Sequence, residues 1–283
     1  MKSTQKHLHT LVLSQIILML TLAGSLSCAS EEEAPDKAVS ISFNVTVGDA
    51  PFVCGQTYDG LGSTATPMGF VDMRFYVHDL ALLDANGKEY PIAMDSDGIW
   101  QRDGVALLDF EDGCENGTMQ LNTSVTGIVP SGNHVGVRFS VGVPPELNSS
   151  ETVLEGRGSP LNQAAMFWSW KSGYKYVRLD GDTGPFRFHL GASSCSADFE
   201  CAEMNIPTVI LDGFDSSNHV VQLDVAELVK GSDISKNTPS TAPGCMGESS
   251  DPDCEDIFIR VGLGEDAAQT AWSVRDMPAK GTP

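Results

Sequence analysis

The sequence predicts a mostly β protein, a single antiparallel β-sandwich-like domain with long disulfide-pinned loops. Apolar and polar residues alternate over residues 41–47 and again over residues 135–141. This period of two is typical of strands that bury one face against a core. Turn-forming residues such as Asp84-Ala85-Asn86-Gly87 separate the strand-like segments, and helical periodicity is scarce.

Ten segments have strand-like composition, and two have weak helical patterns. The region 231–253 is rich in Ser, Pro, Gly and Asp, which predicts a long functional or irregular loop. One or two helical turns are expected at residues 225–230 and around residues 162–168. The expected strands are residues 39–47, 73–83, 105–110, 117–128, 134–143, 174–179, 186–190, 208–211, 219–224 and 256–262.

The N-terminus has the pattern of an export signal. Lys2 and Lys6 precede an apolar run over residues 11–22, which is too short to span a bilayer. Cys28 follows small residues, so it is either the lipidated first residue of a lipoprotein or a neighbour of ordinary signal cleavage. We therefore expect a signal peptide at residues 1–27, an acidic tether at 28–38, a β domain at 39–276 and a tail at 277–283.

The net charge excludes several kinds of partner. The whole chain has 17 basic and 38 acidic residues, and removing Lys2 and Lys6 with the signal leaves 15 basic residues and a net charge of −23. Nucleic acids and anionic lipid surfaces both require basic protein surfaces. Such acidity is compatible with attraction of cations, although solubility explains it equally well.

Besides Cys28 the exported chain has six cysteines, an even number that predicts disulfides in an oxidising compartment. Six cysteines allow 15 pairings, and sequence alone does not choose among them. The short spacings favour Cys195–Cys201 and Cys245–Cys254 as local loops, leaving Cys54 with Cys114. The close CxxC-type spacing of structural zinc sites is absent.

The four histidines of the exported part are the candidate metal ligands, because neutral imidazole suits copper, zinc, iron or nickel. His78 shares a predicted strand face with Arg74 and Tyr76, whereas Asp79 is expected to face away unless the strand ends there. His189 lies at a predicted strand end, where sites are commonly built. His134 and His219 follow turns and are expected on surface loops.

Other chemical signals are weaker. The acidic turns 95–98 and 180–182 resemble fragments of calcium loops without completing one, and the sequence favours solvated turns there. The catalytic sequence motifs of hydrolases, phosphate loops, zinc proteases and c-type haem attachment are absent. The sequence therefore predicts a protein that is not an enzyme.

Several segments together resemble the MbnP family, the four-cysteine proteins of the metallo-mystery pair system. The resemblance runs in order from about residue 39 to 275. It rests most on two distinctive blocks, residues 159–178 (SPLNQAAMFWSWKSGYKYVR) and 243–254 (PGCMGESSDPDC). Residues 73–80, 100–101, 105–112, 114–118, 138–147 and 189–195 also contribute.

The resemblance implies a periplasmic β protein that binds copper and is modified by a partner. That partner is a di-haem cytochrome c peroxidase-like protein of the MauG type, MbnH, which oxidises a tryptophan to kynurenine. His78 and His189 occupy family motif positions, so the resemblance implies that they bind copper. Trp100, Trp168 and Trp170 are the candidates for oxidation, and the sequence does not choose among them.

The chain departs from the family pattern at one potential ligand. The family has Leu-Asn-His where this sequence has Leu147-Asn148-Ser149-Ser150, which puts a third histidine in doubt. Two other functions stay open: a structural or adhesive surface lipoprotein whose tryptophans form core, and calcium-stabilised polysaccharide binding at the acidic turns. The location expected is the periplasm or the outer membrane.

Overall fold

The computed structural model describes residues 35–114, 117–148, 156–168, 173–196, 200–264 and 268–278. The predicted signal, Cys28 and Trp170 lie outside these residues. The described helices are too short or too polar to cross a membrane. The first strand, β1 (Asp36–Val47), begins within the segment predicted to be a tether, because Asp36, Lys37 and Ala38 pair with β9 (Ser124–Pro130).

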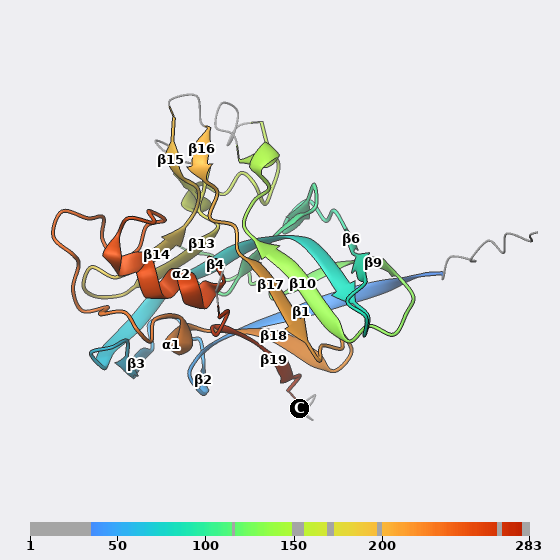
Figure 1. The fold of residues 1–283 in the computed structure, drawn as a ribbon, viewed down its shortest axis with the longest axis horizontal. Coiled ribbons are helices and arrows are strands. Elements are labelled where there is room, and N and C mark those ends of the chain that lie inside the picture. Colours follow the sequence, from blue (N-terminus) through green and yellow to red (C-terminus); the bar gives the residue numbers. More distant parts are fainter. Residues whose placement is uncertain are drawn as a thin grey trace, which may run out of the picture. The chain divides into compact units, whose positions relative to one another are not determined.

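Two sheets form the body of the domain, which confirms the sandwich-like β class. The six-stranded sheet has the order β19-β18-β1-β9-β6, with β2 also paired to β1. The nine-stranded sheet has the order β14-β13-β4-β10-β17, with β3, β5, β7 and β8 joined to it around the long strand β4 (Thr66–Leu83). Figure 1 shows β1 and β4 as long strands that cross the domain. The pairing of β1 with β18 is parallel, so the sandwich is not wholly antiparallel.

The bounds of the strands are as follows. The six-stranded sheet contains β1, β2 (Ala50–Pro51), β6 (Ala93–Met94), β9, β18 (His219–Asp224) and β19 (Trp272–Asp276). The nine-stranded sheet contains β3 (Thr57–Leu61), β4, β5 (Glu89–Pro91), β7 (Gln101–Arg102), β8 (Val105–Asp109), β10 (Gly136–Val141), β13 (Val177–Gly181), β14 (Arg187–Leu190) and β17 (Thr208–Asp212). Two small hairpins add β11 (Phe167–Trp168) with β12 (Gly173–Tyr174), and β15 (Ser193–Cys195) with β16 (Cys201–Glu203).

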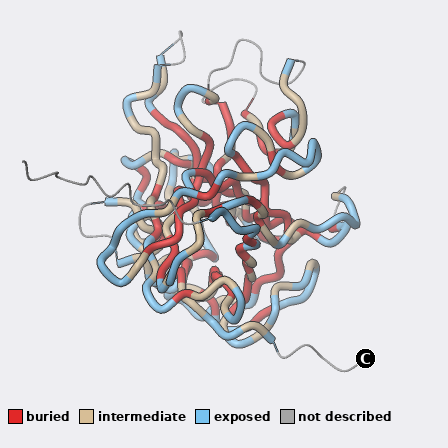
Figure 2. The backbone as a smooth tube through the Cα atoms, turned by 90° about the vertical axis from the view of Figure 1, so that its right-hand side faces the viewer, coloured by how far each residue is buried: buried red, intermediate tan, exposed pale blue. Residues whose placement is uncertain are grey.

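An aromatic cluster joins the two sheets. The Phe43 ring of β1 lies 6.1 Å from Phe75 of β4 and 5.4 Å from Phe139 of β10, measured between centroids. Trp272 of β19 contacts both Phe75 and Phe139, at 5.6 and 5.3 Å. Edge-to-face aromatic pairs of this kind pack favourably beyond the area they bury. Figure 2 shows that the buried residues gather at the centre of the domain.

Some predicted elements were wrong. Residues 256–262 were predicted as a strand but form helix α2 (Glu255–Val261). Its first turn is acidic, Ile257 and Val261 are buried one helical turn apart, and Gly262 ends it with a φ of 108°. These are ordinary helix start and stop signals, and the short apolar run concealed them.

Other segments were right in kind but wrong in extent. Residues 117–123 precede β9 as a loop rather than as strand, and the expected strand 174–179 is interrupted between β12 and β13. The weak helical signal at residues 225–230 gives α1 (Val225–Leu228). Near residue 162 only a turn of 3₁₀ helix, η2 (Ala164–Met166), precedes β11; η1 (Pro145–Leu147) and η3 (Pro252–Cys254) are similar single turns.

Candidate metal centre

The candidate site lies on the face of the nine-stranded sheet that points away from the other sheet. Alternation along β4 sends Phe75 into the inter-sheet core, so Arg74, Tyr76 and His78 share the opposite face. These three side chains are nevertheless buried. The segment after residue 156 reaches Tyr76, whose hydroxyl donates a hydrogen bond of 2.9 Å to the Pro160 carbonyl. Polar groups are thus enclosed on a face that would otherwise meet solvent.

His189 and Asp180 form the best-defined pair on this face. They come from the adjacent strands β14 and β13, and both are buried. His189 Nε2 lies 2.6 Å from Asp180 Oδ1. Asp180 also pairs with Arg178, at 2.7 Å, and with Arg187, at 3.4 Å. One carboxylate is therefore fixed by three cationic or hydrogen-donating neighbours.

The charges around this pair fix the proton on His189. Burial raises the pKa of Asp180, but the hydrogen bond from His189 and the charges of His189 and Arg178 outweigh it and hold that pKa well below its usual range. Burial lowers the pKa of His189 despite the opposing effect of Asp180. Burial thus favours the neutral imidazole, and because an ionised carboxylate only accepts, the nitrogen that faces Asp180, Nε2, carries the proton.

The second ring nitrogen of His189 is consequently free to bind a metal. Nδ1 is buried and has no hydrogen-bond partner among the described residues. A histidine held by a carboxylate through one nitrogen, with a lone pair on the other, is the usual arrangement of a metal-binding histidine. His189 therefore offers one nitrogen lone pair, that of Nδ1, as a candidate metal ligand.

Trp168 lies beside His189. It ends β11, is 7% exposed, and its ring centroid is 6.2 Å from that of the imidazole. Gly191 makes this approach possible, because a Cβ at that position would lie 2.6 Å from Trp168 Cζ3. The structure thus brings together two of the residues that the sequence singled out, His189 and Trp168.

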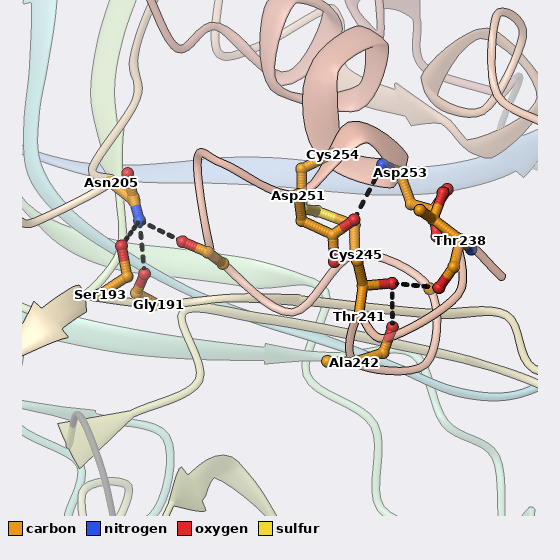
Figure 3. Close-up of a disulfide and its surroundings, with 12 residues drawn as sticks. Gly191, Ser193, Asn205, Thr238, Thr241, Ala242, Cys245, Asp251, Asp253 and Cys254 are labelled. Carbon is orange, nitrogen blue, oxygen red and sulfur yellow. Dashed lines mark hydrogen bonds between the residues drawn. A yellow bond between two sulfur atoms is a disulfide. The ribbon is translucent and has the colours of Figure 1, made fainter.

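The loop pinned by a disulfide supports the strand that carries His189. The backbone N–H of Cys245 donates to the Arg187 carbonyl at 2.8 Å, and that of His189 donates to the Cys245 carbonyl at 2.9 Å. Figure 3 shows the Cys245–Cys254 disulfide and Asn205, whose amide nitrogen donates to the Gly191 and Gly247 carbonyls at 2.9 and 2.8 Å. The C-terminal end of β14, which carries His189, is therefore hydrogen-bonded to the disulfide loop and, through Gly191, to Asn205.

His78 has a similar local arrangement at a different place. A β-bulge interrupts the pairing of β4 with β10 after His78, and Asp79 there has a φ of 50°. Asp79 Oδ2 lies 3.0 Å from His78 Nδ1, while His78 Nε2 is buried without a hydrogen-bond partner among the described residues. The expectation that Asp79 faces away was wrong, because the bulge turns its side chain back. Burial lowers the pKa of His78.

His78 and His189 share one face of one sheet but are not neighbours. His189 pairs with Arg178, and Arg178 pairs with Arg74, which is four residues before His78 on β4. Strand geometry then separates them by roughly 13 Å along β4 and about 10 Å across two strands. The structure does not bring His78 beside His189 and Trp168, and a shared ion stays a prediction.

Comparison with known proteins gives the family. The model of the MbnP family matches residues 36–247, which is more than half of the chain. The chain belongs to the MbnP family. Its structure is similar to that of MbnP from Methylosinus trichosporium, with a TM-score of 0.75 and 28% sequence identity, over 87% of this chain and 100% of that one. A search of curated proteins found no match.

The remaining candidates of this MbnP-family chain lie elsewhere. Trp100 is partly buried against the core before β7. His134 packs on the Tyr90 ring at 4.9 Å, and His219 Nδ1 accepts a hydrogen bond from the Asp215 N–H at 2.9 Å. Ser149 and Ser150, where the resemblance led us to expect a histidine, lie outside the described residues, as does Trp170.

All three predicted disulfides are present: Cys54–Cys114, Cys195–Cys201 and Cys245–Cys254. Sequence reasoning missed Asp180, which it assigned to a solvated turn. A usable signal existed, because Arg178 and Asp180 alternate on a strand that returns through a short turn to His189. That pattern predicts that all three share a face.

Proposed function

We propose that this MbnP-family protein binds copper outside the cytoplasm, on the Nδ1 side of His189 and beside a tryptophan that is oxidised to kynurenine. The observation that carries the proposal is a buried, neutral imidazole with one nitrogen bound to a carboxylate and the other unpartnered. Such an imidazole is an established ligand type for copper. It is also preorganised, since Asp180 is itself fixed by Arg178 and Arg187.

We assign the oxidised residue to Trp168 rather than to Trp100 or Trp170. The support is its ring contact with His189, at 6.2 Å. Indole offers no basic lone pair, whereas kynurenine carries an aromatic amine and a ketone. Oxidation would therefore convert a packing residue into a donor group beside an existing imidazole. The oxidising partner is proposed to be a di-haem peroxidase-like protein of the MbnH type.

His78 is proposed as a secondary histidine. Its free Nε2 and its contact with Asp79 suit metal binding, but its position along β4 separates it from His189. We therefore expect His189→Ala to abolish the tight site, and His78→Ala to weaken binding less. The acidic surface of the chain would favour approach of a cation.

Copper titration of histidine variants tests the ligand assignment. The comparison is wild type, His189→Ala, His78→Ala and, as a matched control, His219→Ala, which removes a histidine of another sheet. Loss of tight binding in His189→Ala alone would support the proposal. Equal binding by wild type and His189→Ala would refute it.

Intact-mass measurement of protein purified from its own host tests the modification separately. Kynurenine differs from tryptophan by the loss of one carbon and the gain of one oxygen, and peptide mapping assigns the site. Unmodified protein from a host with the haem partner would favour the alternative of a structural surface lipoprotein. The same preparation shows whether Cys28 carries lipid.

A further inference from the structure

A second group of side chains with metal-ligand atoms lies where the loop after β8 meets the segment before β3. It consists of Glu111, Cys54 and Cys114, whose ligand atoms all lie within 4.8 Å of one another. The two cysteines form a disulfide that joins this loop to the segment before β3. Glu111 is only 1% exposed. A carboxylate buried this deeply against a disulfide requires a physical explanation.

The loop is built around the Glu111 carboxylate but leaves one oxygen unused. Oε1 accepts a hydrogen bond of 2.6 Å from the Thr118 N–H, whereas Oε2 is buried without a partner among the described residues. Gly117 closes the loop over the carboxylate, because a Cβ there would collide with Oε2. Burial raises the pKa of Glu111. An unpaired buried oxygen costs about 1–3 kcal/mol, so the position favours a further ligand.

We propose that reduction of Cys54–Cys114 opens a second metal site, in which two thiolates and Glu111 bind a divalent cation of the zinc class. Zn²⁺ takes thiolate and carboxylate ligands together. In the oxidised protein the sulfur atoms are bonded to each other and offer no thiolate. The site therefore exists only after the disulfide has accepted two electrons and two protons.

The chemistry balances with a phosphine as reductant. A trialkylphosphine and one water molecule convert the disulfide to two thiols, and the phosphine becomes its oxide. The cation then displaces the two thiol protons and the proton of Glu111 if it is present, so binding strengthens as pH rises. Cys54 is partly exposed and Cys114 is buried, so the reductant and the ion reach the site from the Cys54 side.

The groups around the cluster carry more negative than positive charge. Asp72 and Arg74 act electrostatically on Glu111, and Asp109, two residues before it, faces the same guanidinium. Arg74 faces all three carboxylates and Arg178 also pairs with Asp72 at 3.0 Å, so the carboxylates outnumber the guanidinium groups by three to two, an excess of negative charge that favours a cation. This inference does not depend on the copper proposal, because none of these groups is His189 or Trp168.

Cadmium titration tests the site, since thiolate-bound Cd²⁺ has a strong ultraviolet charge-transfer band. A Cys195→Ser/Cys201→Ser background removes the cysteines of the β15–β16 hairpin. After phosphine reduction we expect about one Cd²⁺ per chain, displaceable by Zn²⁺, with no band before reduction. Adding Cys54→Ser/Cys114→Ser should remove that equivalent. Glu111→Gln should weaken binding at least about tenfold, since even indirect partners of a metal contribute 10–100-fold.

Three results would overturn the proposal. A band that survives Cys54→Ser/Cys114→Ser would come from the cysteines that remain, Cys28, Cys245 and Cys254, instead. Equal affinity in Glu111→Gln and its parent would remove the carboxylate from the site. Loss of the far-ultraviolet dichroism of the β domain on reduction would show that the folded loop does not outlast the disulfide. His189→Ala should leave the Cd²⁺ band unchanged, which separates this site from the copper site.

Discussion

Asp180→Asn is the sharpest test of the reasoning about His189. The substitution keeps the size of the side chain but removes the charge that pairs with Arg178 and Arg187 and accepts from His189 Nε2. An amide can present its N–H to Nε2, and this would move the imidazole proton to Nδ1. The nitrogen that we assign to copper would then no longer offer a lone pair.

The magnitude follows from the surroundings of Asp180. Removing one partner of a buried ion pair costs about 3–5 kcal/mol. Arg178 retains Asp72 at 3.0 Å, and both arginines are partly exposed, at 23% and 33%. We therefore expect a smaller loss, of about 1–3 kcal/mol. Copper affinity should fall by about 10–100-fold, as it does when the carboxylate behind a metal-bound histidine is removed.

The assays are urea unfolding followed by tryptophan fluorescence and copper titration of the same preparations. Asp182→Asn is the matched control, since Asp182 is an exposed carboxylate in the same turn and accepts a hydrogen bond from the Gly69 N–H. The pH dependence gives a further check. The pKa of Asp180 is depressed, so its contribution is present above the unfolded-state pKa near 4 and is lost as pH falls below it. Unchanged copper affinity in Asp180→Asn would refute the ligand assignment to Nδ1.

Three further perturbations test the fold around the site. Gly191→Ala should displace Trp168 and lower stability by about 1–3 kcal/mol through overpacking, seen as a changed near-ultraviolet dichroism spectrum; an unchanged spectrum would contradict the close approach. Burial raises the pKa of Asp109 to about 6, so its protonated form is favoured in the fold; stability therefore falls as pH rises from the unfolded-state pKa near 4 to about 6 and is level above that. Asp109→Asn should therefore stabilise the protein at pH 8 by about 1–3 kcal/mol and flatten its stability profile, and a destabilised variant would show that the charge is needed. Replacing Cys54–Cys114 should cost about 4 kcal/mol and replacing Cys195–Cys201 about 2 kcal/mol in denaturant unfolding, because their sequence separations are 60 and 6 residues; the reverse order would contradict the loop-entropy account.

The sequence predicted the class of the fold because its strands obey a local rule. Alternation marked β1 and β10 directly, and short cysteine spacings predicted two of the disulfides. Strand pairing is not local, so the parallel contact between β1 and β18 gave no signal in either segment. Helix α2 was misassigned because its short apolar stretch, Ile257-Phe258-Ile259, fits a strand or a helix equally well.

The sequence identified several residues of the candidate site, but it did not show which of them lie next to each other in the fold. The tryptophan block and His189 were found from the sequence, and β11 and the tight approach at Gly191 bring them together. Asp180 was missed because its neighbours Gly181 and Asp182 have the composition of an exposed turn. Asp79 was placed on the wrong side because a bulge with a left-handed residue breaks the alternation from which its direction was read.

His78 and His189 each face a carboxylate, Asp79 and Asp180, but the two carboxylates differ in how firmly they are held. This difference leads us to expect different affinities for a metal at the two histidines. Asp180 is buried and anchored by two arginines, so it fixes the ring of His189 before any metal arrives. The side chain of Asp79 is 64% exposed, and the interactions that the structure records for it join it only to His78. Binding at His189 therefore requires little reorganisation, whereas binding at His78 must also order Asp79, which costs conformational entropy. Both histidines are buried, so the arginine pair behind Asp180 is the reason why we expect His189 to be the stronger ligand.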